Sequence, residues 1–323
     1  MARHIEVNGD LEVRKAEVII KARYKLNPLS LKFITALIAG LKRSDDINEE
    51  YVFRVKDFKE LMGLKRKDLY WAVKEAVGEL LDKPLHIPTE DGFIMCNWIS
   101  GGHYIESAGE VRFFIYPKLR PYLLEAQEKF LKYRLENILS LRSTYSIRMY
   151  EILKDWLELN KRYGKKAEKI ISVKELREIL EIPRSYPYGG SSGIKYRVIE
   201  KAKKELAEHT DIIFDYEEIK TGRKVTHIKF IIEDKNRYSF LKSKKAFVNY
   251  LRTHYVNKPI IDTPNKNANG QMSKWSISER GLLYDMNKVE DDINATRSDQ
   301  VFEALYNFAK ENQQFAEKLA KRE

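Results

Sequence analysis

Residues 193–210 read GIKYRVIEKAKKELAEHT, and this stretch separates into two faces on a helix of 3.6 residues per turn. One face is apolar and consists of Ile194, Val198, Ile199, Ala202 and Leu206. The opposite face is polar and consists of Tyr196, Arg197, Glu200, Lys203 and Lys204. A hydroxyl of Ser191 or Ser192 is predicted to cap the first turn, because it can accept from the free backbone N–H groups there. The stretch therefore predicts an amphipathic helix with a basic outer face.

An alternating segment follows this helix directly. IIFDYEEIK and RKVTHIKFIIE flank Thr221-Gly222, which predicts a β-hairpin with Lys220, Arg223 and Lys224 at its tip. A basic helix followed by such a hairpin is the layout of a winged helix, in which the helix lies in the DNA major groove and the wing contacts the backbone. An ordinary amphipathic helix beside a hairpin fits this segment equally well, so the rest of the chain must distinguish the two interpretations.

The composition favours an intracellular protein with a basic surface. Among 323 residues the chain has 59 Lys and Arg against 48 Asp and Glu, a net charge of +11. Residues 129–240 hold 25 of the basic and 17 of the acidic residues, so the excess surrounds the stretch described above, as expected for a phosphate-binding surface. A single cysteine, Cys96, excludes an internal disulfide, and neither a membrane-spanning apolar run nor a signal peptide is recognisable. We therefore expect a cytosolic protein.

The same order of elements occurs in the first part of the chain. The expected elements are helices at Ser30–Leu41, Lys56–Met62 and Lys65–Leu81, a strand at Tyr51–Val55, and further strands in PLHIP, FIMCNWIS and VRFFIYP. VKELREILEI at Val173–Ile182 repeats VKDFKELMGL at Val55–Leu64, and Val198–Leu206 repeats the spacing of Ala72–Leu80. Ordered matches of this kind, each followed by a hairpin, predict two copies of one domain.

We therefore expect an α+β fold built from tandem winged-helix domains. The first domain is predicted at residues 1–130 and the second at residues 131–236, with a mainly helical C-terminal extension at residues 237–323. The extension is predicted to end in one helix from Ser298 onward, with Asn312 among apolar seam positions. Such an asparagine can select a coiled-coil partner, although packing of this helix within its own chain, or no fixed packing at all, fits better than self-association.

The two copies differ in the charge of the outer helix face. In the first copy Glu75 and Asp82 dilute a basic surface, so we expect this copy to contact DNA more weakly or to share its surface with a protein. The candidate DNA-binding residues of the first copy are Lys65, Arg66, Lys67, Trp71 and Lys74.

The second copy carries the stronger candidate site. Arg197 is the expected base reader, because its planar fork pairs with guanine O6 and N7. Glu200 either accepts from cytosine N4 or supports Lys204, whereas Lys203 and Lys204 are expected to contact phosphates or to remain solvated. The candidate residues of this helix and its start are Ser191, Ser192, Lys195, Tyr196, Arg197, Glu200, Lys203 and Lys204.

Two segments resemble a known family. RSTYSIRMYEILKDW at Arg142–Trp156 and IKYRVIEKAKKEL at Ile194–Leu206 are similar to motifs of the iteron-binding plasmid replication initiators, and the hairpin with TGRKV also fits. The resemblance covers roughly residues 10–236. It implies a protein that binds repeated sites in double-stranded origin DNA, opens the duplex and helps to load host helicase or initiator proteins. It also implies a homodimer in equilibrium with a monomer, self-repression of its gene, and a stronger second domain.

No motif for catalysis or for a cofactor accompanies these segments. The six histidines form no close pair of the kind that a rolling-circle nuclease needs for its metal, and there is no P-loop sequence. We expect no enzymatic activity, no cofactor and no metal. The alternatives are a winged-helix transcriptional repressor, which needs only an inverted repeat at a promoter, and a non-catalytic interaction protein of the replication or segregation machinery.

Overall fold

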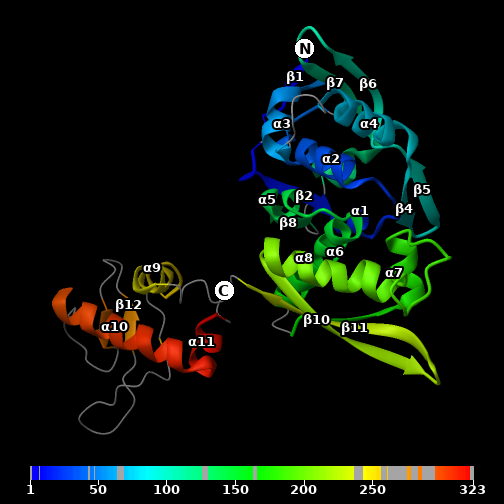
Figure 1. Cartoon of the computed structure of the whole chain (residues 1–323). Helices are drawn as coiled ribbons and strands as arrows, with labels where there is room; N and C mark the ends of the chain where they lie inside the picture. Colours follow the sequence, from blue (N-terminus) through cyan, green and yellow to red (C-terminus); the bar gives the residue numbers. More distant parts are fainter. Residues whose placement is uncertain are drawn as a thin grey trace. The chain divides into compact units, whose positions relative to one another are not determined.

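The computed structural model describes most of the chain. The described residues are 2–6, 8–42, 44–46, 48–63, 69–125, 130–162, 166–235, 243–255, 260, 275–277, 283–285 and 295–320. The chain divides into two compact units, Met1–Glu233 and Asp234–Glu323. Figure 1 shows the helices and strands of both units.

The first winged helix lies in the N-terminal part of the first unit. Its elements in order are α2 (Pro28–Gly40), β3 (Tyr51–Arg54), α3 (Val55–Met62), α4 (Leu69–Asp82), β4 (Leu85–Thr89), β5 (Gly92–Cys96), β6 (Ile99–Ile105) and β7 (Glu110–Ile115). FIMCNWIS is therefore not one strand, because β5 ends at Cys96 and β6 begins at Ile99. GGHYI, which lies between the expected strands FIMCNWIS and VRFFIYP, belongs to β6, where Tyr104 pairs with Val111 of β7.

The second winged helix follows with the same order of elements. They are α6 (Thr144–Arg162), β9 (Glu168–Ser172), α7 (Val173–Ile179), a helix formed by η4 (Lys195–Glu200) and α8 (Lys201–His209), β10 (Ile212–Thr221) and β11 (Lys224–Asp234). We call the helix Lys195–His209 the recognition helix and the β10–β11 hairpin the wing.

The sheets confirm that the two copies share one topology. In the first copy β3 pairs antiparallel with β7, which pairs with β6, and in the second β9 pairs antiparallel with β11, beside β10. Each copy therefore places the strand after its first helix against the second strand of its hairpin. The first copy also contains the β4–β5 hairpin, inserted between its third helix and its wing, and β1 (Arg3–His4) beside β3.

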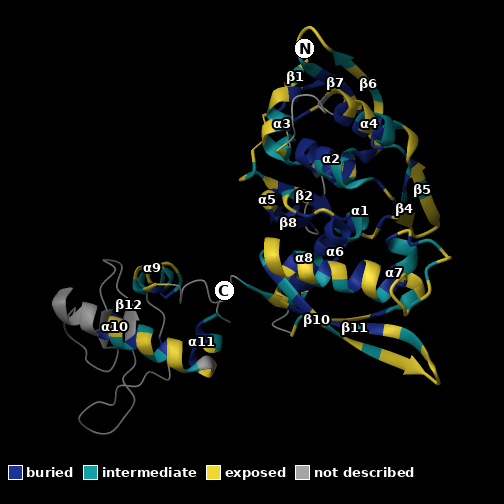
Figure 2. Ribbon diagram, in the orientation of Figure 1, coloured by how far each residue is buried: buried dark blue, intermediate teal, exposed yellow. Residues whose placement is uncertain are grey.

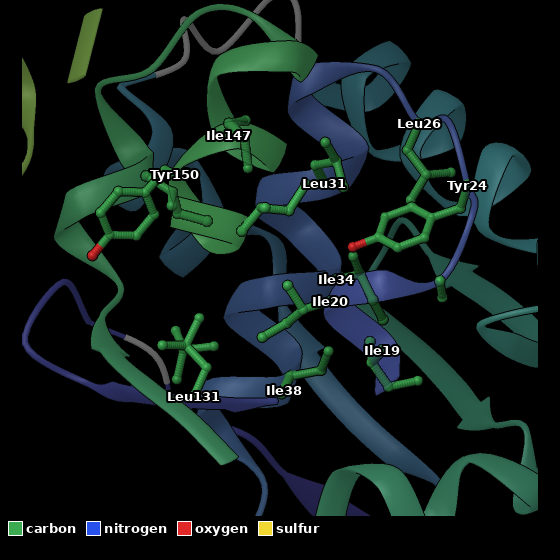
Figure 3. Close-up of a cluster of buried hydrophobic side chains, with 14 of the residues drawn as sticks. Ile19, Ile20, Tyr24, Leu26, Leu31, Ile34, Ile38, Leu131, Ile147 and Tyr150 are labelled. Atoms are coloured by element: carbon green, nitrogen blue, oxygen red, sulfur yellow. The ribbon is translucent and has the colours of Figure 1, made fainter. Parts of the chain in front are cut away.

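Residues on both sides of the expected boundary at residue 130 contribute to one core. Strand β2 (Glu12–Ala16) pairs antiparallel with β8 (Phe130–Arg134), and α1 (Glu17–Lys21) follows β2. Figure 3 shows Leu31 of α2 beside Ile147 of α6, within one cluster of buried side chains that also contains Ile19, Ile34 and Tyr150. Two short helical segments, η2 (Pro117–Leu119) and η3 (Pro121–Glu125), connect β7 to β8, and α5 (Glu136–Leu139) connects β8 to α6.

A buried charge cluster crosses this core. The Lys15 Nζ of β2 lies 2.6 Å from Oε1 of Glu151 on α6, and both side chains are fully buried. Arg148 donates to the other Glu151 oxygen at 3.1 Å and to the Ile20 and Ala22 carbonyls. Tyr133 also donates to Glu151, at 2.7 Å. Buried charges are tolerated only when paired and hydrogen-bonded, so this cluster links β2 and the C-terminal end of α1 to α6.

A glutamate at matching positions supports both copies. Glu79 of α4 accepts from the backbone N–H of Asn27 at 2.7 Å, and Asn27 caps α2. Glu205 of the recognition helix accepts from the backbone N–H of Arg142 at 2.9 Å, just before α6. In each copy the third helix thereby satisfies N–H groups at the start of the first helix. Glu79 and Glu205, which occupy matching positions of the two copies, are therefore structural residues.

The second unit has its own small core. Its elements are α9 (Lys244–His254), β12 (Trp275–Ile277), β13 (Leu283–Asp285), α10 (Ala295–Glu311) and α11 (Gln313–Ala320). Leu305, Phe315 and Leu319 pack with Phe247 and Leu251 of α9. No helix within the described part of the whole chain combines the length and the apolar character needed to cross a membrane.

The expectation of one continuous C-terminal helix was wrong. The helix breaks at Asn312, whose Oδ1 accepts from the backbone N–H of Phe315 at 3.0 Å and so caps α11. Asparagine competes with the backbone for hydrogen bonds, and this explains why it starts a new helix here instead of occupying a coiled-coil seam. The apolar residues on either side pack within their own unit.

Candidate nucleic-acid interface

The recognition helix begins without the expected serine cap. Ser191 and Ser192 lie exposed in a turn, and the structure gives neither a capping hydrogen bond. The backbone N–H groups of Ile194 and Lys195 donate instead to the carbonyls of Pro187 and Tyr188, at 2.8 and 2.9 Å. Because the preceding loop satisfies these donors, the helix does not need a hydroxyl at its start.

Gly193 makes this close approach of the loop possible. A Cβ at this position would lie 2.2 Å from the Gly189 carbonyl oxygen and 2.7 Å from that of Tyr188. Both obstacles are backbone atoms, which cannot move aside as a flexible side chain does. A side chain at residue 193 would therefore displace the loop from the first turn of the recognition helix.

The outer face of the recognition helix is exposed. Figure 2 shows exposed residues along α8 and at the free end of the wing. Tyr196 is 53% exposed, and Lys204 is also exposed. The Arg197 guanidinium lies 5.0 Å from the centre of the Tyr186 ring and donates to the Tyr186 hydroxyl at 3.1 Å. The tyrosine thus holds the guanidinium in place without neutralising its charge.

Other polar side chains of this helix reach the first wing strand. Lys195 Nζ lies 2.9 Å from Oε1 of Glu218, and Lys203 Nζ lies 2.8 Å from Oδ1 of Asp215. Tyr216 donates to Glu200 at 2.5 Å. Glu200 therefore accepts from Tyr216, a partner that was not among the cytosine and Lys204 considered from the sequence.

The pKa values of the two wing carboxylates reflect these ion pairs. The hydrogen bond from Lys203 holds the pKa of Asp215 below its usual value, and the hydrogen bond from Lys195 does the same for Glu218. Tyr188 adds a second hydrogen bond to Glu218, at 3.1 Å. Both carboxylates are therefore ionised near neutral pH and act as counterions of the lysines.

The tip of the wing carries exposed basic residues. Gly222 has a φ of +61°, a left-handed conformation that lets the chain reverse between β10 and β11. Lys220, Arg223 and Lys224 around this turn are all exposed. In Figure 1 the wing extends past α7 and α8 to its free tip. The three cations therefore lie where a winged helix contacts the DNA backbone.

The corresponding surface of the first copy is aromatic. Trp71 is 65% exposed, and Lys74 Nζ lies 5.2 Å from the centre of its ring. Tyr70 packs edge-on against Trp71 and Tyr104, and sequence reasoning did not single it out. Glu75 accepts from the side chain of Asn27 at 2.7 Å. Lys65, Arg66 and Lys67 lie outside the described residues.

Sequence reasoning also missed the residues that hold the basic side chains of the recognition helix. Tyr186, Asp215 and Glu218 hold Arg197, Lys203 and Lys195, but they come from a loop and from the strand that follows. The alternation of IIFDYEEIK predicts a strand without indicating which acids reach the helix. As for other chemistry, no group of three or more His, Cys, Asp or Glu among the described residues is placed to hold a metal ion.

Two family models match the chain over the same two copies. The first winged-helix domain of an initiator replication protein matches residues 12–154, and the second winged-helix domain of an initiator Rep protein matches residues 172–232. The chain belongs to the initiator Rep protein family. The tandem winged-helix fold and the family resemblance are thereby confirmed.

Individual relatives of this Rep family member share less than a third of its residues over the matched regions. A replication initiation protein of Escherichia coli is 28% identical over 186 residues, which is 55% of this chain and 57% of that protein. The chain thus matches little more than half the length of this relative. The crystal structure of the Pi initiator protein in complex with iteron DNA has a TM-score of 0.59 and 21% identity, covering 71% of this chain and all of that one. At this identity the likeness concerns the fold.

Proposed function

We propose that this Rep family member initiates plasmid replication by binding repeated sequences, or iterons, in the double-stranded origin. The observation that carries the proposal is the exposed recognition helix beside a wing with Lys220, Arg223 and Lys224 at its tip. The major groove is about 12 Å wide and admits an α-helix, while wing cations can neutralise phosphates alongside. The family membership and the fold shared with an initiator bound to iteron DNA support the same conclusion.

The second winged helix is proposed as the main reader of the site. Arg197 can offer its fork to a guanine without breaking an ion pair, because the partner that holds it among the described residues is the neutral Tyr186. Lys203, Lys204 and the wing tip are assigned to phosphates, with Lys195, Tyr196 and Glu200 beside them. The first copy, through Trp71 and Lys74 and with Lys65, Arg66 and Lys67, is assigned weaker contacts and dimerisation.

Origin opening and recruitment of host proteins are proposed to follow from DNA binding, without any catalysed reaction. Binding at successive repeats is proposed to open the origin and to recruit host helicase or initiator proteins in the cytosol. We further propose that a homodimer, in equilibrium with a monomer, represses the gene of this protein. The proposed role is non-catalytic and requires no cofactor. The C-terminal extension, residues 237–323, is assigned no step.

Replication of a small DNA circle tests this proposal. The circle carries the gene and its flanking DNA in a bacterial host, and a matched circle carries the gene with an early stop codon. We expect the first circle to replicate and the second to be lost, with replication restored when the intact protein is supplied in trans. A circle that never replicates, together with binding of the protein to an inverted repeat at its promoter, would favour the repressor alternative.

A further inference from the structure

We infer that Asp215 and Glu218 on the first wing strand are specificity-determining residues, which act as internal substitutes for DNA phosphates. They occupy Lys203 and Lys195 in the free protein and thereby weaken binding to random-sequence DNA more than binding to the specific site. This inference rests on the proposed function, since it concerns the surface assigned there to DNA.

The geometry places each carboxylate where a phosphate oxygen is expected to bind. The Lys195–Glu218 and Lys203–Asp215 separations, 2.9 and 2.8 Å, are those of a charge-assisted hydrogen bond to an anion. The Lys203 side chain is 37% exposed and that of Asp215 is 69% exposed, so this pair lies at the surface. Lys195 and Glu218 are more enclosed, at 32% and 23%. The lysines are therefore ordered and accessible, but already paired.

An incoming phosphate must compete with these carboxylates. If it replaces one of them, an intramolecular ion pair is lost, and if it binds beside one of them, two anions repel each other. Either outcome reduces the gain from each lysine–phosphate contact. Binding to random-sequence DNA depends almost entirely on lysine–phosphate and arginine–phosphate contacts, so weaker phosphate contacts lower nearly all of its affinity.

The specific complex has a further source of affinity. Base contacts add to the phosphate contacts and compensate for the displaced carboxylates. Arg197, the proposed base reader, is held by the hydroxyl and ring of Tyr186 and has no carboxylate to release. The two acids thus compete for Lys203, which is assigned above to a phosphate, and for Lys195 beside it, but not for the arginine assigned to a base. This arrangement widens the difference in affinity between specific and random sequences.

A matched control lies on the same strand. Glu217 lies next to Glu218 in the sequence, but its carboxylate lies 3.6 Å from Nζ of Lys229 on β11 instead of contacting the recognition helix. Lys229 also pairs with Glu168 of β9, at 3.1 Å. Glu217→Gln therefore makes the same change in net charge as Glu218→Gln, on the same strand, without releasing a lysine of the recognition helix.

The test measures binding of the full chain to a labelled random-sequence duplex across a range of salt concentrations. Glu218→Gln and Asp215→Asn keep the size and hydrogen-bonding capacity of the side chains, and circular dichroism confirms their fold. We expect each variant to bind the random duplex about two- to tenfold more tightly, and the double variant to show a salt slope steeper by up to about 0.9 per released lysine. Glu217→Gln is expected to change neither quantity by as much.

A duplex selected by the wild-type chain completes the test. Its affinity is expected to rise less than that of the random duplex, so the ratio of specific to random binding falls in the double variant. Equal changes for Glu218→Gln and Glu217→Gln, or an unchanged ratio in the double variant, would overturn the inference while leaving the proposed function intact. A wild-type chain that binds no duplex DNA would overturn the proposed function itself.

Discussion

At the scale of single residues, the environment of each cation indicates its role. Arg197 lies over the Tyr186 ring, so its donors are ordered but its charge is not cancelled. Lys224 is exposed at the wing tip, where sequence-independent backbone contacts are expected. The Arg197 guanidinium suits the edge of a guanine, whereas the Lys224 ammonium suits a phosphate. Substitution of these two residues should therefore affect DNA affinity in different ways.

Arg197→Ala is expected to cost about 1–3 kcal/mol at the specific site and to relax the preference at one base pair. Lys224→Ala should instead weaken all sequences to the same extent and reduce the salt slope by about 0.9. Titration of both variants against the specific and a random duplex at several salt concentrations separates these outcomes. If Arg197→Ala weakened random DNA as much as the specific site, Arg197 would not be a base reader.

At the scale of elements, periodicity predicted the helices and strands well, whereas it failed where loops determine the ends of helices. The apolar face Ile194–Leu206 and the alternating wing strands were correctly recognised, because burial of one face leaves a repeat in the sequence. Ser191 and Ser192 carry a good capping signal, yet the Pro187 and Tyr188 carbonyls satisfy the helix instead. Hydrogen bonds to loop carbonyls produce no periodic pattern in the sequence, so they could not be predicted from it.

Gly193→Ala is expected to destabilise the start of the recognition helix, because its Cβ meets two backbone oxygens within 3 Å. We expect a lower melting temperature and at least a tenfold loss of affinity for the specific duplex, about 1.4 kcal/mol or more. Gly189→Ala is the matched control, since a Cβ there meets nothing within 4 Å. Thermal unfolding and DNA titration of both variants check this, and equal behaviour of the two would contradict it.

At the scale of the whole molecule, the two winged helices of the first unit share a core and a buried charge cluster. Lys15 and Glu151 are 136 positions apart in the sequence, and nothing in either neighbourhood indicates that they meet. Burial alone would raise the pKa of Glu151, but the charges of Lys15 and Arg148 hold it below its ordinary value of 4.5. The repeat was visible in the sequence, whereas the link between its copies was not.

Glu151→Gln is expected to reduce the free energy of unfolding by about 3–5 kcal/mol, because it leaves buried cations without their carboxylate. Glu158→Gln on the same helix removes a partly exposed partner of Lys154 and should cost less than about 1 kcal/mol. Denaturant unfolding measures both values. A cost for Glu151→Gln no larger than that for Glu158→Gln would show that the cluster does not stabilise the fold.

The same variant should alter the pH dependence of stability. A carboxyl whose pKa is lowered on folding contributes stability above its unfolded value and loses it as pH falls through the folded value. The contribution of Glu151 is therefore complete above about pH 4.5 and declines in more acidic solution. The difference in unfolding free energy between wild type and Glu151→Gln should accordingly shrink on acidification.

Hydroxyl-radical footprinting of the full chain on the DNA that flanks its gene tests the central claim most directly. An iteron-binding initiator should protect several directly repeated sites at regular spacing, with contacts about one helical turn apart within each site for the two winged helices. Arg197→Ala should require about five- to 150-fold more protein for the same protection, because it is expected to cost about 1–3 kcal/mol at each site. Protection confined to a single inverted repeat at a promoter, or no sequence-selective protection at all, would contradict the account.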